Sequence, residues 1–585
     1  MAGALDPPSL NTPAGFAGML GAAAATTAVI FALGVLATAP AVWLVARLLP
    51  VSRGGRRRWW WHRAYPSAVV AAALWPALLP PLHAGLRGAG APVIGAIATA
   101  GAIALWALLL VAARVRPAGP SQWTAGAGIG LTAIMLGVAA VAIGTNAAGR
   151  QRLDAGGRPN ILLVSIDSLR ADHVHAYGYP RQTTPTLDAL AREGARFRTV
   201  VAPSSWTLPS HLTLLTGLPP EGHGVVADGQ RLTERAVFLS EALWGAGYTT
   251  AGFVSAPYLD AAYGFSQGFD HYDDYTLAKR SFTDSHHGET GPVIAQLFSG
   301  WLARWEQGGS ERPFFAFLHL WDAHYDYTPP PPYERLFDPD YQGSITADDF
   351  EHNPRIHAGM DPRDLAHVVA LYDGEIRFVD DTLASILAEL RRRGILDRTI
   401  VVVTADHGEE FFEHGRKGHK QALYDESLLV PLIIRYPRRV AAGTVVNEQV
   451  RLMDVGSTIL ALAGVAPPAG FGGEAGGYRA RDLTPWLAAA PASRPPALPA
   501  FADLVGDAPV PLAAIRTPER KLIAERSAQP HDALFDLVRD PGEHENVIAS
   551  EPKAEPALRA ELSDWRHAWS TDQLSTEVAL SDAHR

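Results

Sequence analysis

The chain has 585 residues, more than one hydrophobic core normally serves, so at least two domains are expected. Its formal net charge is −10, and no basic stretch studded with aromatic residues follows residue 149, which argues against a nucleic-acid partner. The absence of cysteine excludes disulfides and thiolate metal sites.

The first 149 residues are apolar and carry few charges. Four stretches, at about 16–37, 65–82, 92–111 and 123–143, have the roughly 20-residue length that a bilayer crossing needs. The arginines between 53 and 63 indicate a cytoplasmic loop by the positive-inside rule. The sequence therefore predicts a multi-pass domain of about four transmembrane helices (1–149) in the cytoplasmic (inner) membrane. A short polar linker (150–158) and an extracytoplasmic remainder are predicted to follow.

An apolar run, Ile161–Ile166, follows the linker and ends in Asp167. Such a run is typical of a parallel strand buried on both faces. A carboxylate directly after the strand lies where open α/β sheets place their ligands.

A second segment, SSWTLPSHLTLLTG, places a hydroxyl residue, Thr207, just before Pro209 and a helical pattern. Proline in the first turn and a hydroxyl residue before it are start signals for a helix. The N-terminus of a helix attracts anions. Together with Asp167, this arrangement suggests chemistry on a phosphate or sulfate ester.

Two further strands are predicted, at Pro313–Leu320 and Thr399–Thr404, with an amphipathic helix from Asp364 to Arg393 between them. Ionisable residues gather at the carboxyl ends of both strands. After or at the first lie His319, Asp322 and His324, and after the second lie Asp406, His407, His414, Lys417 and His419. Because the carboxyl ends of parallel strands meet at one edge of a sheet, the sequence predicts a single site there.

These segments resemble the sulfatase branch of the alkaline phosphatase superfamily. The matching motifs are NILLVSIDSLRADH, TLPSHLTLLTG, LYDGEIRFVDDTLASIL, TADHGEEFFEHG, GHKQALYDESLLVPLII and ALFDLVRDPGEHENV, between about residues 158 and 547. The resemblance implies an α/β fold, a mostly parallel sheet sandwiched by helices, with a small C-terminal antiparallel subdomain. The corresponding limits are 159–505 for the catalytic domain, 506–550 for the subdomain and 551–585 for a C-terminal helix and tail.

The resemblance also assigns roles residue by residue. Asp167, Asp406 and His407 match metal ligands, and Thr207 matches the nucleophile position and would join them on the metal. His324 and His419 match positions that hold the ester oxygens or protonate the leaving group. The expected substrate contacts are His324, His419, Lys417, His211 and Asp322.

The chain departs from the sulfatase pattern at several positions. Thr207 stands where sulfatases carry the Cys or Ser that becomes formylglycine, and His211 stands where they carry Arg. Ser168 and His407 replace a usual Asp and Asn. The set is similar to that of lipoteichoic acid synthases and lipid A phosphoethanolamine transferases, which use one metal. A His among carboxylates favours Mn²⁺ or Zn²⁺ over Ca²⁺, and a weaker second metal near Asp322 is a further expectation.

Three functions remain open at this stage. The leading one is a membrane-anchored, metal-dependent enzyme that cleaves or transfers phosphoric or sulfuric esters through a covalent Thr207 ester, with phosphodiesters slightly favoured. The second is a true sulfatase that uses unmodified threonine. The third is a non-catalytic binding or sensor protein with the same fold. A lipid headgroup and a glycan are the substrate candidates, and the sequence does not predict the oligomeric state.

Overall fold

The computed structural model describes residues 157–274, 290–308, 312–473, 476–487, 495–506, 510–569 and 574–577. The chain divides into two units, Met1–Gln151 and Arg152–Arg585, and all the described residues belong to the second.

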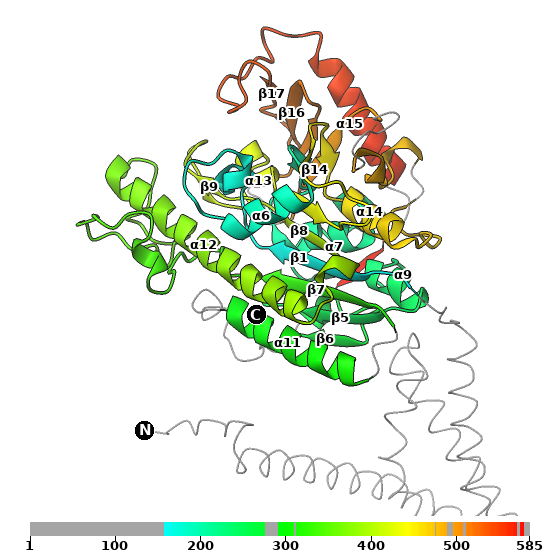
Figure 1. Cartoon of the computed structure of the whole chain (residues 1–585). Helices are drawn as coiled ribbons and strands as arrows, with labels where there is room; N and C mark the ends of the chain where they lie inside the picture. The colour runs from blue at the N-terminus through cyan, green and yellow to red at the C-terminus, as the bar shows by residue number, and fades with distance from the viewer. Residues whose placement is uncertain are drawn as a thin grey trace, which may run out of the picture. The chain divides into compact units, whose positions relative to one another are not determined.

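An eight-stranded sheet forms the centre of the described unit (Figure 1). Its strands lie in the order β12 (Thr444–Val446), β2 (Ala195–Phe197), β11 (Leu432–Arg435), β8 (Thr399–Ala405), β1 (Asn160–Ile166), β7 (Phe314–Leu320), β5 (Thr249–Phe253) and β6 (His271–Asp273). The five neighbouring strands from β8 to β6 are parallel, whereas β11 is antiparallel to both β8 and β2. The predicted mostly parallel sheet is confirmed.

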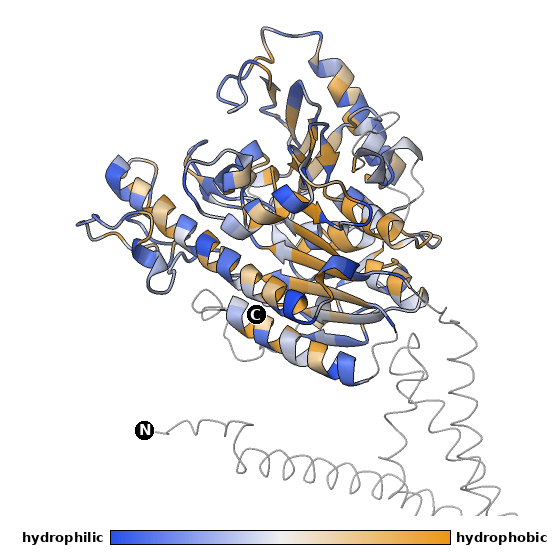
Figure 2. Ribbon diagram, in the orientation of Figure 1, coloured by the Kyte–Doolittle hydropathy of each residue, from blue (hydrophilic) through white to orange (hydrophobic). Residues whose placement is uncertain are grey.

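The central strands β1, β7 and β8 are buried along their whole length, as their continuous apolar sequences predict. Figure 2 shows these strands as the hydrophobic centre of the unit. Their register pairs Ile166 of β1 with Leu320 of β7 on one side and Ala405 of β8 on the other. The three strands therefore end level, and the residues that follow them emerge at the same edge.

Helices form a layer on each side of this sheet (Figure 1). On one side α6 (Pro185–Glu193), α11 (Gly291–Gln307) and α12 (Pro362–Arg392) pack together, and on the other α7 (Thr207–Thr216), α9 (Leu239–Gly245) and α14 (Asp454–Ala463) do so. The long helix α12 corresponds to the predicted amphipathic helix. Buried Asp380 of α12 accepts hydrogen bonds from the backbone N–H groups of Thr186 and Leu187, and thereby caps the first turn of α6.

A second sheet of four antiparallel strands follows near the C-terminus: β14 (Ala500–Leu504), β15 (Leu512–Arg516), β16 (Arg520–Glu525) and β17 (Ala533–Asp536). The C-terminal helix α15 (Glu555–Trp569) packs on it, with the Trp565 ring stacked 4.7 Å from that of Phe501. The sheet begins at Ala500, and the domain limits derived from the sequence stay predictions.

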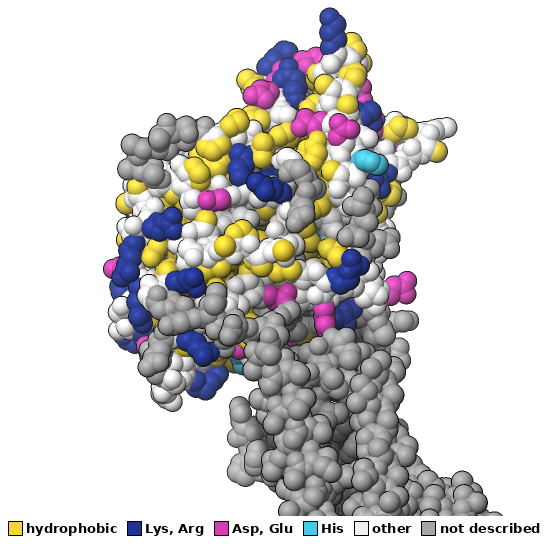
Figure 3. Space-filling model, turned by 90° about the vertical axis from the view of Figure 1, so that its right-hand side faces the viewer, with side chains coloured by type: hydrophobic (Ala, Val, Ile, Leu, Met, Phe, Trp, Pro, Cys, Tyr) yellow, Lys and Arg dark blue, Asp and Glu magenta, His cyan; other side chains and the backbone are white. Residues whose placement is uncertain are grey.

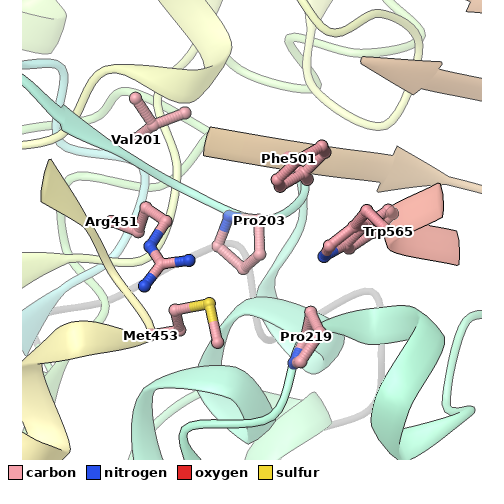
Figure 4. A pocket seen from close by; sticks show the side chains of 7 residues that line it. All are labelled: Val201, Pro203, Pro219, Arg451, Met453, Phe501 and Trp565. Atoms are coloured by element: carbon pink, nitrogen blue, oxygen red, sulfur yellow. The ribbon is translucent and has the colours of Figure 1, made fainter. Parts of the chain in front are cut away.

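A small pocket lies where this second sheet and α15 meet the nucleophile segment (Figure 4). It is lined by Val201, Pro203, Pro219, Arg451, Met453, Phe501 and Trp565. Its cavity volume of ≈ 10 Å³ has room for about one water molecule. The pocket is therefore too small for an ester substrate.

Four buried charged residues join the second sheet to the loop after β8. The Lys521 ammonium lies 2.8 Å from Asp425 Oδ1 and 2.9 Å from Glu543 Oε1, and Arg516 donates to both oxygens of Asp425. Burial alone would raise the pKa of Asp425, but the charges of Lys521 and Arg516 outweigh it and hold that pKa well below its usual range. Asp425 begins the short helix α13 (Asp425–Leu428), which this cluster fixes in place.

Large exposed hydrophobic side chains are few and scattered among the described residues: Val293, Leu336, Val445 and Val538. On the face shown in Figure 3, hydrophobic side chains are interspersed with basic and acidic ones. The described surface on this side therefore has the mixed character of a surface in contact with water.

The predicted location in the inner membrane requires correction. Across the described residues, no helix combines the length and the apolar character that a bilayer crossing requires. The four stretches predicted to span the membrane lie outside the described residues. We therefore withdraw the assignment of the chain as a multi-pass membrane protein.

The buried charge cluster yields a stability prediction. Replacing Lys521 by Met leaves the carboxylates of Asp425 and Glu543 buried without their shared cation, so Lys521→Met should lower the free energy of unfolding by about 3–5 kcal/mol. Urea unfolding followed by tryptophan fluorescence measures this loss. The exposed Lys553 provides the control, since Lys553→Met should change stability by less than about 0.5 kcal/mol. A similarly small change for Lys521→Met would contradict the role given to the cluster.

Candidate active site

Three side chains from the ends of two neighbouring strands form a potential metal site. Asp167 follows β1, and Asp406 and His407 follow β8; all three are fully buried. One ligand atom from each lies within 4.8 Å of the others. The sequence predicted this grouping from the strand ends, and the structure brings the three residues together.

The donor atoms of this group fit a cation. His407 Nδ1 lies 2.8 Å from the carbonyl oxygen of Gly408, which can only accept, so Nδ1 carries the hydrogen. The other nitrogen, Nε2, then presents a lone pair 3.2 Å from Asp406 Oδ2, a buried oxygen that receives no hydrogen bond. Two facing lone pairs repel unless a positive charge lies between them. A His whose second nitrogen is held by a carbonyl is the usual arrangement of a metal-bound imidazole.

The surroundings of Asp167 also favour a nearby cation. Burial raises the pKa of its carboxyl group to about 6, although His407 and the hydroxyl groups of Ser168 and Thr207 act in the opposite direction. A bound cation would stabilise the ionised form. Among the described residues, this is the one group of at least three His, Asp or Glu side chains with metal-binding spacing. The expected second metal near Asp322 therefore gains no support there.

Thr207 lies beside this group at the start of α7. Its Oγ1 is 3.4 Å from His407 Nε2, and its side chain is almost fully buried. The preceding loop is anchored by the Ser204 hydroxyl, which donates to the Asp503 carbonyl oxygen of the second sheet. Because Thr207 is the first residue of the helix, the first-turn N–H groups have no partner within α7 and can face an anion near its hydroxyl.

His324 and His419 lie near the potential metal site. The His419 ring centroid is 4.5 Å from that of His407 and 5.0 Å from that of His324. His419 Nδ1 is 3.1 Å from Glu409 Oε1, and His324 Nδ1 is 2.6 Å from the carbonyl oxygen of Tyr325. In both histidines Nδ1 thus contacts a protein oxygen, which fixes the orientation of the ring.

Three of the expected substrate contacts have other partners. Asp322 accepts hydrogen bonds from Thr290 and from the N–H of Gly291, so it caps α11. The Lys417 ammonium donates to two backbone carbonyls of the segment 353–356. His211 contacts Ser165 Oγ through Nε2 at 2.9 Å and the Thr207 carbonyl through Nδ1 at 3.0 Å. These side chains shape the surroundings of the site, and their local sequence gave no sign of these partners.

The structure also shows contacts of residues that were not among the expected metal ligands and substrate contacts. His319 Nε2 lies 3.1 Å from Asp167 Oδ2, and Glu409 links His419 to the hydroxyl of Tyr327. Lys420, rather than Lys417, lies beside the nucleophile: its ammonium is 4.5 Å from the Trp206 ring, and its N–H donates to the Ser205 carbonyl. Glu409 could have been found from the sequence, since it lies two residues after His407, which the sequence had already singled out.

Comparison with known proteins agrees with this geometry. Residues 159–465, slightly more than half of the chain, match the model of the sulfatase family. The chain belongs to the sulfatase family. It is similar to an ulvan-active sulfatase of Formosa agariphila, with 26% identity over 67% of this chain and 77% of the relative. It is likewise 26% identical to a multifunctional alkaline phosphatase superfamily protein, PehA, of Trinickia caryophylli, over 57% of this chain and 77% of that one.

The solved structures agree on the fold. A phosphonate monoester hydrolase of Agrobacterium radiobacter aligns with 70% of this chain and 96% of its own, with a TM-score of 0.57 and 24% identity. Members of the family are metal-dependent hydrolases of sulfate or phosphate esters, so the prediction that this sulfatase-family chain is an enzyme is confirmed. The non-catalytic alternative is accordingly set aside.

The geometry predicts which carboxylates retain a metal. The purified chain should hold about one tightly bound divalent ion, and Asp406→Asn or His407→Ala should lose most of it, because each substitution removes a ligand from the potential metal site. Metal content measured by mass spectrometry after gel filtration tests this. Asp322→Asn is the matched control. Asp322 caps the start of α11, so this variant should keep the metal. Equal retention in all the variants would show that the three residues do not form the site.

Proposed function

We propose that this enzyme cleaves or transfers phosphoric or sulfuric esters through a covalent ester on Thr207, with phosphodiester-type substrates favoured. The observation that supports this most directly is the position of the Thr207 hydroxyl. It lies at the N-terminus of a helix and against a buried group of acceptor atoms that fits a cation. A hydroxyl in such a position can be activated, whereas an ordinary threonine is a weak nucleophile.

The residues proposed to hold one metal ion are Asp167, Thr207, Asp406 and His407. The imidazole among oxygen donors favours Mn²⁺ or Zn²⁺ over Ca²⁺, which prefers shells made of oxygen alone. When bound, such an ion lowers the pKa of a coordinated hydroxyl group and offsets negative charge on ester oxygens.

The protein's own residues carry the remaining chemistry. Thr207 Oγ1 first releases its proton to solvent; it then bonds to the central phosphorus or sulfur, while the bond to the leaving oxygen breaks. His419, oriented by Glu409, is proposed to give a proton from Nε2 to that oxygen, and His324 to hold the ester oxygens. In the second step the oxygen of water or of an acceptor hydroxyl bonds to the central atom and gives its proton to Nε2 of His419, while the bond to Thr207 Oγ1 breaks and restores Thr207.

The charge of the site favours a singly charged ester. A phosphomonoester carries nearly two negative charges at neutral pH, whereas a phosphodiester or a sulfate ester carries one. The sulfatase pattern has Arg at position 211, but here a His is engaged by Ser165 and Thr207, and Lys417 is engaged by backbone carbonyls. Fewer cations therefore remain to balance a doubly charged substrate.

The nucleophile favours phosphorus over sulfur. A formylglycine hydrate can expel sulfate by reverting to the aldehyde, a route that threonine lacks. A threonyl ester must instead be attacked at its central atom, and attack at phosphorus is assisted by positive groups around the equatorial oxygens. The likeness to a multifunctional alkaline phosphatase superfamily protein and to a phosphonate monoester hydrolase agrees with phosphoryl chemistry.

A true sulfatase that uses unmodified threonine is the second candidate. The family match and the likeness to an ulvan-active sulfatase favour it. It shares the proposed residues and differs in the ester attacked. Glycan and lipid-headgroup esters are the substrate classes to compare under either proposal.

Kinetics on synthetic aryl esters separate the two candidates. The ratio kcat/KM should be highest for an aryl phosphodiester, lower for the phosphomonoester and lowest for the sulfate. Thr207→Ala should lower it by roughly 10³-fold or more, because the covalent route is lost. Thr207→Ser retains a hydroxyl and should retain measurable activity, unlike Thr207→Ala. If kcat/KM for the sulfate is tenfold above that for the diester, and is lost in Thr207→Ala, the sulfatase alternative is correct and the phosphodiester preference is wrong.

A further inference from the structure

Ser168, the residue after Asp167, has an unusual backbone conformation. Its φ angle is +54°, in the left-handed region that residues other than glycine rarely adopt, and it is fully buried. Such a conformation persists only where the surroundings impose it, and it is often found at functional sites.

Hydrogen bonds on both sides of Ser168 hold this conformation. Its N–H donates to Asp406 Oδ1 at 3.2 Å, and its hydroxyl donates to Asp167 Oδ1 at 2.9 Å. Its carbonyl oxygen accepts from the Tyr372 hydroxyl at 2.7 Å, and that hydroxyl accepts from the N–H of Arg170 at 3.1 Å. Tyr372 is fully buried in the middle of α12. A helix that contributes no metal ligand therefore fixes the turn at Ser168, which contacts both Asp167 and Asp406.

The consequence concerns how the two carboxylates can bind. Ser168 donates to one oxygen of each, and His319 Nε2 lies against the second oxygen of Asp167. An oxygen that accepts a hydrogen bond has fewer lone pairs left, so each carboxylate is directed to give one bond to a cation rather than two. Ca²⁺ takes six to eight oxygen ligands, often from bidentate carboxylates, and such a site supplies too few.

We propose that Ser168, held by Tyr372, is a positioning residue that sets the metal selectivity of the site against Ca²⁺. This inference rests on the proposed function, because it requires that Asp167, Asp406 and His407 bind a divalent ion. Ser168 acts through the two carboxylates and has no need to touch the ion or the substrate.

The first test changes the donor into a ligand. Aspartate tolerates the left-handed conformation better than most residues, so Ser168→Asp keeps the turn and adds a carboxylate. Isothermal titration of the metal-stripped full-length chain gives Kd for Mn²⁺, Zn²⁺ and Ca²⁺. The ratio of the Ca²⁺ Kd to the Mn²⁺ Kd should fall at least tenfold. A merely structural effect would change all three Kd values by a similar factor, and that result would overturn the proposal.

The second test separates positioning from folding. Ser168→Gly relieves the backbone strain and removes the hydroxyl, so its thermal midpoint should equal or exceed that of the wild type. Its Kd for Mn²⁺ should nevertheless rise, by roughly 10- to 100-fold if Ser168 acts like other partners of metal ligands. Wild-type affinity and selectivity in Ser168→Gly would overturn the proposal.

The tyrosine has a matched control in the same unit. The Tyr177 hydroxyl also bridges a backbone carbonyl and an N–H, both of Leu432, away from the two carboxylates. Tyr372→Phe should weaken Mn²⁺ binding, whereas Tyr177→Phe should not, and equal effects would count against the positioning role. A wild-type chain that binds no divalent ion would overturn the proposed function and this inference together. Metal binding that is unchanged in the variants would overturn this inference alone.

Discussion

The structure depends on one electrostatic constraint: two carboxylates and an imidazole are buried together. With ligand atoms within 4.8 Å, two like charges repel by about 3.5 kcal/mol at an effective dielectric constant of about 20. The level ends of β1 and β8 force this proximity, and the hydrogen bonds of Ser168, His319 and Gly408 offset only part of its cost. A bound cation would balance the remaining acceptor atoms. The arrangement of the strand ends is therefore what makes this site favourable for a metal ion.

The C-terminal sheet holds two segments that lie beside the potential metal site. It holds the nucleophile loop through Ser204 and Asp503, and it holds the start of α13 through the buried pairs of Asp425 with Arg516 and Lys521. Both segments flank the potential metal site, one next to Thr207 and the other after His419. The small sheet therefore anchors both segments, one through a hydrogen bond and the other through buried ion pairs.

Sequence reasoning found the parts of the site that regular structure dictates. Asp167, Asp406 and His407 directly follow apolar strands, and parallel strands bring their ends to one edge, so their grouping was predictable. The sequence did not predict the partners of Asp322 and Lys417, because Thr290 and the segment 353–356 come from loops that carry no periodic pattern. The expected substrate contacts of both side chains stay predictions. The contact between His211 and Ser165 likewise could not be predicted from the sequence, because the two residues are far apart along the chain. The membrane location, inferred from the apolar stretches and the arginines between 53 and 63, is the prediction that required correction, since no helix among the described residues can cross a bilayer.

The most direct test of the central claim, covalent catalysis by Thr207, is a mass measurement. The enzyme is mixed briefly with an aryl phosphodiester, quenched in acid and digested, and the peptide that contains Thr207 is weighed by mass spectrometry. The account predicts that this peptide gains the mass of the substituted phosphoryl group, with fragmentation placing it on Thr207. Turnover of the diester with an unmodified Thr207 peptide at every quench time, or with the group on another residue, would contradict it.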